Sequence, residues 1–380
     1  MSISSRILLL ALLAPPVWAA DKADPKEVAA YRDASARFLQ RTDEFRADVR
    51  AIVDQTEAEE RQKITDSYGA VLTQLQDQDT ALRRVAIARL EAFLQKYKSV
   101  PDTPEMMYRL ADLYLEDSEI SFIAENNAYQ QLVAQLPDGQ EPPEGPAKDY
   151  SRSIALYHQI IEGYPDYALL PNAYSNLSWC LGAPNAAQFD PVAAHDVNLE
   201  IIQRFPNTAF SDDANMRLGE FYFDQPGPRE NPTQNVQVAI GYYTKVYQRG
   251  TSSRFYDKAI YKLGWSNYKL SNYTNALKYM VELMDYSQTM LETTGQPSDM
   301  RPEAVTYLAI SYADIADRTG RKPVAVAMDH LDSVAKDSKG ERKWGHEIVE
   351  RLADTLLRQA KFDQAVEVLR YMQERWPLDP

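Results

Sequence analysis

Apolar residues recur at helical spacing along most of the chain, and a leucine followed by a small residue marks each period. Six such pairs occur, at intervals close to 44 residues after a first interval of 67. Positions four before and four after the leucine are mostly alanine, tyrosine or leucine, which places them on one helical face. The small residue would let a second helix approach closely. The pairs are Leu110-Ala111, Leu177-Ser178, Leu218-Gly219, Leu263-Gly264, Leu308-Ala309 and Leu352-Ala353.

A second apolar helix is predicted after each pair, and three of these end in an aromatic residue followed by proline. Those ends are Tyr164-Pro165, Phe205-Pro206 and Trp376-Pro377, where proline cannot continue the helix. Loops rich in Pro, Gly and Asn separate the two helices of a pair. The pattern therefore predicts stacked helix hairpins. The loops are expected at 137–147, 182–191, 224–235 and 317–323 within pairs, and at 286–302 between pairs.

The first hundred residues show a different pattern, with no proline between Lys26 and Val100. Steps of three and four relate eight positions, two of them hydroxyl residues, and indicate a heptad seam. Asp79-Thr80 is a plausible start for a further helix. We expect this segment to be a helical hairpin that caps the first repeat; the alternative is an oligomeric coiled coil through residues 26–58. The heptad positions are Val28, Tyr31, Ser35, Phe38, Thr42, Phe45, Val49 and Ile52.

The repeated unit resembles the tetratricopeptide repeat (TPR) family, most clearly over residues 259–276 and 345–377. Leu263-Gly264 is followed by Ala276 thirteen residues after the leucine, and Leu352 and Ala365 keep the same separation. Asn267 and Ser271 depart from the family pattern. The resemblance implies an all-α, right-handed α-solenoid of TPR-like helix hairpins, with an N-terminal helical cap or coiled coil.

The expected organisation has three parts: a signal peptide over 1–19, an N-terminal helical segment over 20–100, and a solenoid of about six helix pairs over 101–380. The last helix would expose Val366, Leu369 and Met372. We therefore expect another subunit, or a segment beyond Pro380, to cover this end.

In the TPR family the first helices line the concave side, so the resemblance implies a groove for protein partners. Two repeats would give it an aromatic lining with acidic flanks, suited to a peptide or helix carrying basic residues. The groove residues expected are Trp179, Met216, Glu220, Phe223, Asp224, Tyr261, Trp265, Tyr268 and Lys269.

The N-terminus carries the pattern of a secretory signal. One arginine, Arg6, precedes an apolar run that ends at Pro15-Pro16, and Ala19 offers a cleavage site. Together with the end Phe205-Pro206, the repeats resemble those of bacterial envelope proteins: the barrel-assembly lipoprotein, the Tol coordinator and gliding-motility TPR proteins. This resemblance implies a periplasmic adaptor in envelope assembly, division or motility machinery.

Composition argues against several other functions. The formal net charge of −14 disfavours nucleic acid as a partner, and no segment is apolar enough to span a membrane. Cys180 is the only cysteine, and we expect it to be a buried structural thiol. The four histidines fall in different repeats, and neither a phosphate loop nor a metal-ligand spacing appears. We expect no catalytic, cofactor or metal site; the alternative is a peptidoglycan-associated helical enzyme or a glycan-binding protein.

Overall fold

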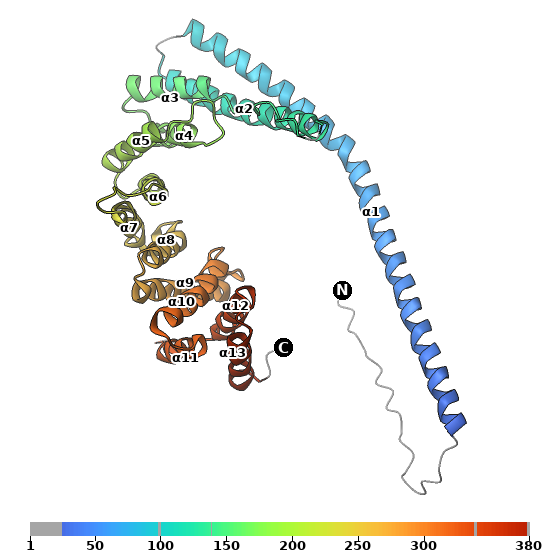
Figure 1. Cartoon of the computed structure of the whole chain (residues 1–380). Helices are drawn as coiled ribbons and strands as arrows, with labels where there is room; N and C mark the ends of the chain where they lie inside the picture. The colour runs from blue at the N-terminus through green and yellow to red at the C-terminus, as the bar shows by residue number, and fades with distance from the viewer. Residues whose placement is uncertain (1–24, 98–99, 138, 338–339, 378–380) are drawn as a thin grey trace. The chain divides into compact units, whose positions relative to one another are not determined.

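The computed structural model describes residues 25–97, 100–137, 139–337 and 340–377, which are almost entirely helical (Figure 1). The predicted signal peptide, residues 1–19, lies outside the described residues. The elements are α1 (Pro25–Lys96), α2 (Thr103–Ala134), α3 (Ser151–Gly163), α4 (Leu170–Gly182), α5 (Pro191–Arg204), α6 (Ala209–Asp224), α7 (Gln234–Tyr247), the 3₁₀ helix η1 (Gly250–Ser252), α8 (Tyr256–Lys269), α9 (Tyr273–Thr294), α10 (Arg301–Thr319), α11 (Pro323–Ser333), β1 (Lys336–Asp337), β2 (Gly340–Glu341), α12 (Gly345–Arg358) and α13 (Phe362–Arg375).

Residues 83–380 form one unit of consecutively packed helix hairpins. Six hairpins lie within its described part: α2/α3, α4/α5, α6/α7, α8/α9, α10/α11 and α12/α13. Each hairpin also packs on the next, through contacts such as α5 with α6 and α7 with α8. The predicted all-α solenoid of TPR-like hairpins is confirmed. A short antiparallel ribbon of β1 and β2 lies between α11 and α12.

The leucine-plus-small pairs form the interior of the hairpins, as their spacing predicts. All six leucines are at most 3% exposed. A Cβ added to Gly219 would lie 2.2 Å from Cε1 of Tyr243 on α7, and one added to Gly264 would lie 2.6 Å from Cε of Met280 on α9. The small residue is therefore required by the close approach of the second helix.

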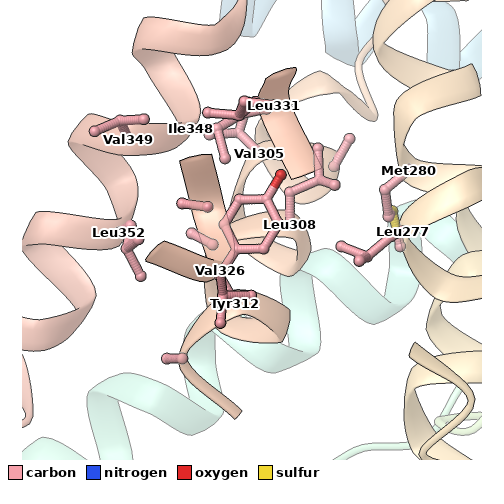
Figure 2. Close-up of a cluster of buried hydrophobic side chains, with 14 of the residues drawn as sticks. Leu277, Met280, Val305, Leu308, Tyr312, Val326, Leu331, Ile348, Val349 and Leu352 are labelled. Carbon is pink, nitrogen blue, oxygen red and sulfur yellow. The ribbon is translucent and has the colours of Figure 1, made fainter. Parts of the chain in front are cut away.

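The largest core joins the last hairpins. Figure 2 shows side chains of α9, α10, α11 and α12 gathered around Tyr312, which is fully buried. The residues labelled there belong to a continuous cluster that extends into α13. The hairpins from α8 to α13 thus share one hydrophobic core.

Helix ends agree with the sequence at some places and differ at others. Tyr164, Phe205 and Trp376 stand directly after α3, α5 and α13, as the aromatic-proline ends predict. The expected loop over 286–302 is wrong for its first half, because α9 continues to Thr294. Ser287 is still buried there, and the helix ends only where Gly295 takes a left-handed φ of 78°.

Helix α1 is continuous over 72 residues, so the helix expected to begin at Asp79-Thr80, and with it the hairpin, is wrong. A cap residue starts a helix only where the preceding backbone is not helical, and no proline interrupts this segment. The end of α1 packs on the first repeat, where Ile87 contacts a cluster containing Leu110 and Tyr114 of α2. Over residues 83–96, the segment therefore covers the first repeat.

The other unit consists of residues up to Leu82, of which 25–82 are helical. Phe45, Val49 and Ile52 of the heptad are exposed, whereas the side chains of Val28 to Phe38 lie outside the described residues. A coiled coil through 26–58 stays a prediction. At the other end of the chain, Val366 and Leu369 of α13 are exposed and Met372 is half-buried.

Candidate functional site

Consecutive first helices place a row of aromatic rings side by side. We define the aromatic row as Phe223 of α6, Tyr261, Trp265 and Tyr268 of α8, and Tyr307 of α10. The centroids of Phe223 and Trp265 lie 4.6 Å apart, those of Trp265 and Tyr307 5.9 Å, and those of Tyr268 and Tyr307 5.4 Å. These separations are typical of favourable aromatic pairs. The row therefore links three hairpins.

Charged groups along the row are engaged within the chain. Nζ of Lys262 lies 2.7 Å from a carboxylate oxygen of Glu220 and 4.8 Å from the ring centre of Trp265. Lys269 donates to the carbonyl oxygen of Phe223 at 3.1 Å and lies 4.2 Å from its ring centre. The cations thus hold neighbouring first helices together as well as charging the surface.

The nine residues expected to line the groove differ in solvent exposure. Met216 and Phe223 are buried in the core around α6 and α7. Tyr261, Trp265, Tyr268 and Glu220 are half-buried, whereas Trp179, Asp224 and Lys269 are exposed. No partner is present, so contact with one stays a prediction; the exposed and half-buried members are those that a partner could reach.

Helices α4, α5 and α6 enclose a pocket of about 680 Å³, a size that suits a ligand or several side chains. We call it the α4–α6 pocket. It contains Trp179, Glu220 and Asp224 of the expected groove, but Tyr261, Trp265, Tyr268 and Lys269 lie outside it. The lining consists of Lys148, Ser178, Trp179, Gly182, Ala183, Pro184, Asn185, Phe189, Pro191, Ala194, His195, Asn198, Arg217, Glu220, Phe221, Asp224 and Gln225.

The pocket lining includes a buried polar side chain and a hydrogen-bonded histidine. The side chain of Asn198 is buried, and its Oδ1 accepts no hydrogen bond within the described part of the chain. His195 is oriented by Tyr222, whose hydroxyl lies 3.1 Å from Nε2, and by Asp196, 3.0 Å from Nδ1. Its ring lies 4.6 Å from that of Phe221. The pocket thus combines aromatic faces with an unused acceptor.

The carboxylates at the pocket change the pKa of a side chain in the core beside it. Burial raises the pKa of Tyr243, and the carboxylates of Glu220 and Asp224 raise it further. Burial likewise raises the pKa of the Cys180 thiol to about 12, with Glu119 and Asp112 contributing. Cys180 is buried, as expected of a structural thiol.

Sequence reasoning missed Tyr307, Phe221, His195 and Asn198. Under the resemblance, the rule for groove residues takes those two before and two, five and six after the leucine of a first helix. Tyr307 directly precedes its leucine and Phe221 lies three residues after its own, so the rule omits both. Asn198 and His195 belong to a second helix, α5, which that rule does not consider. Asn198 could have been noticed because it is a polar residue on the face of α5 that Ala194 and Ile201 make apolar.

Within the described residues, no three His, Cys, Asp or Glu side chains are grouped to hold a metal ion. No helix among those described is long and apolar enough to cross a bilayer.

Comparison with known proteins adds little. No protein-family model matches the chain, and no curated protein sequence does. Solved structures that match include a human IFIT1 dimer with PPP-AAAA, at 13% identity over 78% of this chain and 69% of that one, with a TM-score of 0.26. A human IFIT1 dimer with m7Gppp-AAAA matches at 13% identity over 78% and 68%, with a TM-score of 0.24. At these TM-scores the likeness carries no argument about function, and the solenoid fold is established by the helix order itself.

Proposed function

We propose that this protein is a periplasmic scaffold that binds protein partners in a cell-envelope complex. The observation that carries the proposal is that the α4–α6 pocket lies next to the aromatic row. Glu220 belongs to the pocket and pairs with Lys262 beside Trp265, so the two features are neighbours. A surface contributed by successive hairpins suits a partner that lies across several repeats.

The chemistry of this surface favours a polypeptide. Tyrosine and tryptophan offer a large contact area at low entropic cost, together with a polar group. Trp179 is 39% exposed, so its ring is accessible to a partner. The net charge of −14 disfavours polyanions as the main partner.

Photo-crosslinking in intact cells tests the binding role. A photoreactive residue at Asp224, which is exposed at the pocket, should capture one envelope protein reproducibly. The same residue at Val238, exposed on α7 outside the pocket lining, is the matched control and should give no adduct. Equal labelling from both positions, or labelling of glycan strands alone from Asp224, contradicts the proposal.

The periplasmic location rests on the signal pattern of residues 1–19 and needs its own test. A fusion of the whole chain to alkaline phosphatase, which is active only after export, should be active. The same fusion without residues 1–19 should be inactive, and the exported protein should begin at Ala20. An active fusion without residues 1–19, or an inactive fusion with them, contradicts this part of the proposal.

A further inference from the structure

The α4–α6 pocket contains a polar group that the chain itself does not satisfy. Asn198 on α5 is 4% exposed, and its Oδ1 accepts no hydrogen bond from the described residues. A buried carbonyl oxygen without a donor is costly, and such a group in a native fold calls for an explanation. Asn198 lines the pocket, and a rotation of its side chain would present Oδ1, which has almost no exposed surface, to an N–H donor of a ligand.

The charges around the pocket leave one negative group without a partner. Lys148 pairs with Glu119, and Arg217 pairs with Asp213 at 2.8 Å. Glu220 is also paired, through Lys262. The carboxylate of Asp224 is exposed and has no ion pair among the described residues. The pocket therefore has one uncompensated negative charge, which favours a positively charged ligand.

Three aromatic rings also line the pocket. Trp179 and Phe189 are exposed, and Phe221 is half-buried. The ring of Trp179 packs on Tyr150, with centroids 5.4 Å apart, and the ring of Phe221 packs on His195. These contacts hold both rings at the pocket, where their faces can attract a cation.

We infer that the α4–α6 pocket binds an arginine side chain of the partner polypeptide. The guanidinium donates to Oδ1 of Asn198 and to the carboxylate of Asp224 while its plane stacks on an aromatic wall. Arginine fits better than lysine, because its planar group has five donors, stacks on rings and is weakly hydrated. This inference rests on the proposed function and specifies which side chain anchors the partner.

The test uses the mature chain and three short peptides that differ at one residue: arginine, lysine or citrulline. Citrulline keeps the shape of arginine without its charge. Binding is followed by the NMR shift of the Trp179 indole N–H at millimolar peptide. The arginine peptide should bind at least about tenfold more tightly than the citrulline peptide, the gain typical of a charge-assisted hydrogen bond in a sheltered site. Equal affinity for arginine and citrulline overturns the inference, and equal affinity for arginine and lysine overturns the choice of a guanidinium.

Two variants separate recognition from folding. Asp224→Asn changes an exposed side chain, so the fold should survive while arginine binding weakens at least about fivefold. Asp363→Asn, which changes an exposed side chain of α13, is the matched control and should bind as the wild type does. Asn198→Leu should also lose binding, and its helical circular dichroism reports whether it folds. Unchanged affinity in Asp224→Asn overturns the inference. If the arginine peptide does not bind but the crosslink at position 224 still captures a protein, only the arginine assignment fails; loss of the crosslink refutes the scaffold role.

Discussion

Replacing Gly219 with alanine tests the close approach of helices on which the hairpin packing depends. The added Cβ would lie 2.2 Å from Cε1 of Tyr243 and 2.7 Å from its Cδ1 and Cζ. The ring of Tyr243 is fully buried among the residues that join α6 to α7. It therefore cannot turn aside, and either α7 must move away from α6 or the ring must leave its rotamer.

Two opposing effects set the size of the change. Alanine favours a helix over glycine by about 1 kcal/mol, whereas an extra methyl in a filled core costs about 1–3 kcal/mol. A contact of 2.2 Å with a rigid ring belongs at the upper end of that range. We expect Gly219→Ala to lower the free energy of unfolding by about 1–2 kcal/mol.

Two matched glycines provide the controls in thermal melts followed by circular dichroism. A Cβ on Gly241 of α7 meets nothing within 4 Å, so Gly241→Ala should stabilise the chain by about 0.5–1 kcal/mol. At Gly264 the nearest atom is the terminal methyl of Met280, which is flexible, so the loss should be smaller than at Gly219. In a Tyr243→Leu background, the cost of Gly219→Ala should shrink. A Gly219→Ala chain that melts at or above the wild-type temperature would refute the packing argument.

Three further predictions concern other parts of the chain. Burial lowers the pKa of His330 in the folded state, so the unfolded chain binds a proton at this residue at a higher pH than the folded chain does. The free energy of unfolding should therefore fall as pH drops through about 6.5. His330→Gln should reduce that pH dependence in urea titrations, and an unchanged pH dependence contradicts the prediction. Arg342 donates to both carboxylate oxygens of Asp285, at 2.8 and 2.6 Å. Asp285→Ala should therefore lower the free energy of unfolding by about 2–3 kcal/mol and speed proteolysis near β1 and β2. Asp329→Ala, which removes an exposed pair with Arg321, should lower it by less than about 1 kcal/mol. Phe45 is 68% exposed within the heptad, so the purified chain should sediment as an oligomer and a variant without residues 26–58 as a monomer. Sedimentation of both as monomers refutes the coiled coil.

The repeat architecture could be predicted because it depends on local periodicity. A leucine, a small neighbour and an alanine or tyrosine one turn away define a buried helical face wherever they occur, and all six leucines proved buried. Aromatic-proline pairs located helix ends for the same reason, since proline acts on the backbone of its own segment. Where the signal was only a preference, as at Asp79-Thr80 or over 286–294, the helix continued through it.

The candidate site was predicted in part. Trp265 and Tyr268 were expected on the surface of a first helix and do belong to the aromatic row, but their contacts with Tyr307 depend on how one hairpin is placed on the next. Met216 stands two residues before its leucine, as Tyr261 does, yet Met216 is buried and Tyr261 is half-buried. The difference arises from the neighbouring helices, which periodicity within one helix does not describe.

The sequence by itself determined that the chain folds as a series of helix hairpins, which residues face the interior, and why Gly219 and Gly264 are small. The tertiary structure alone decided that Asn198, Phe221 and Trp179, from three different helices, meet in one pocket. Helical periodicity specifies a face relative to its own axis, whereas a pocket depends on the rotation and offset between helices, which are set by the packing of many side chains at once.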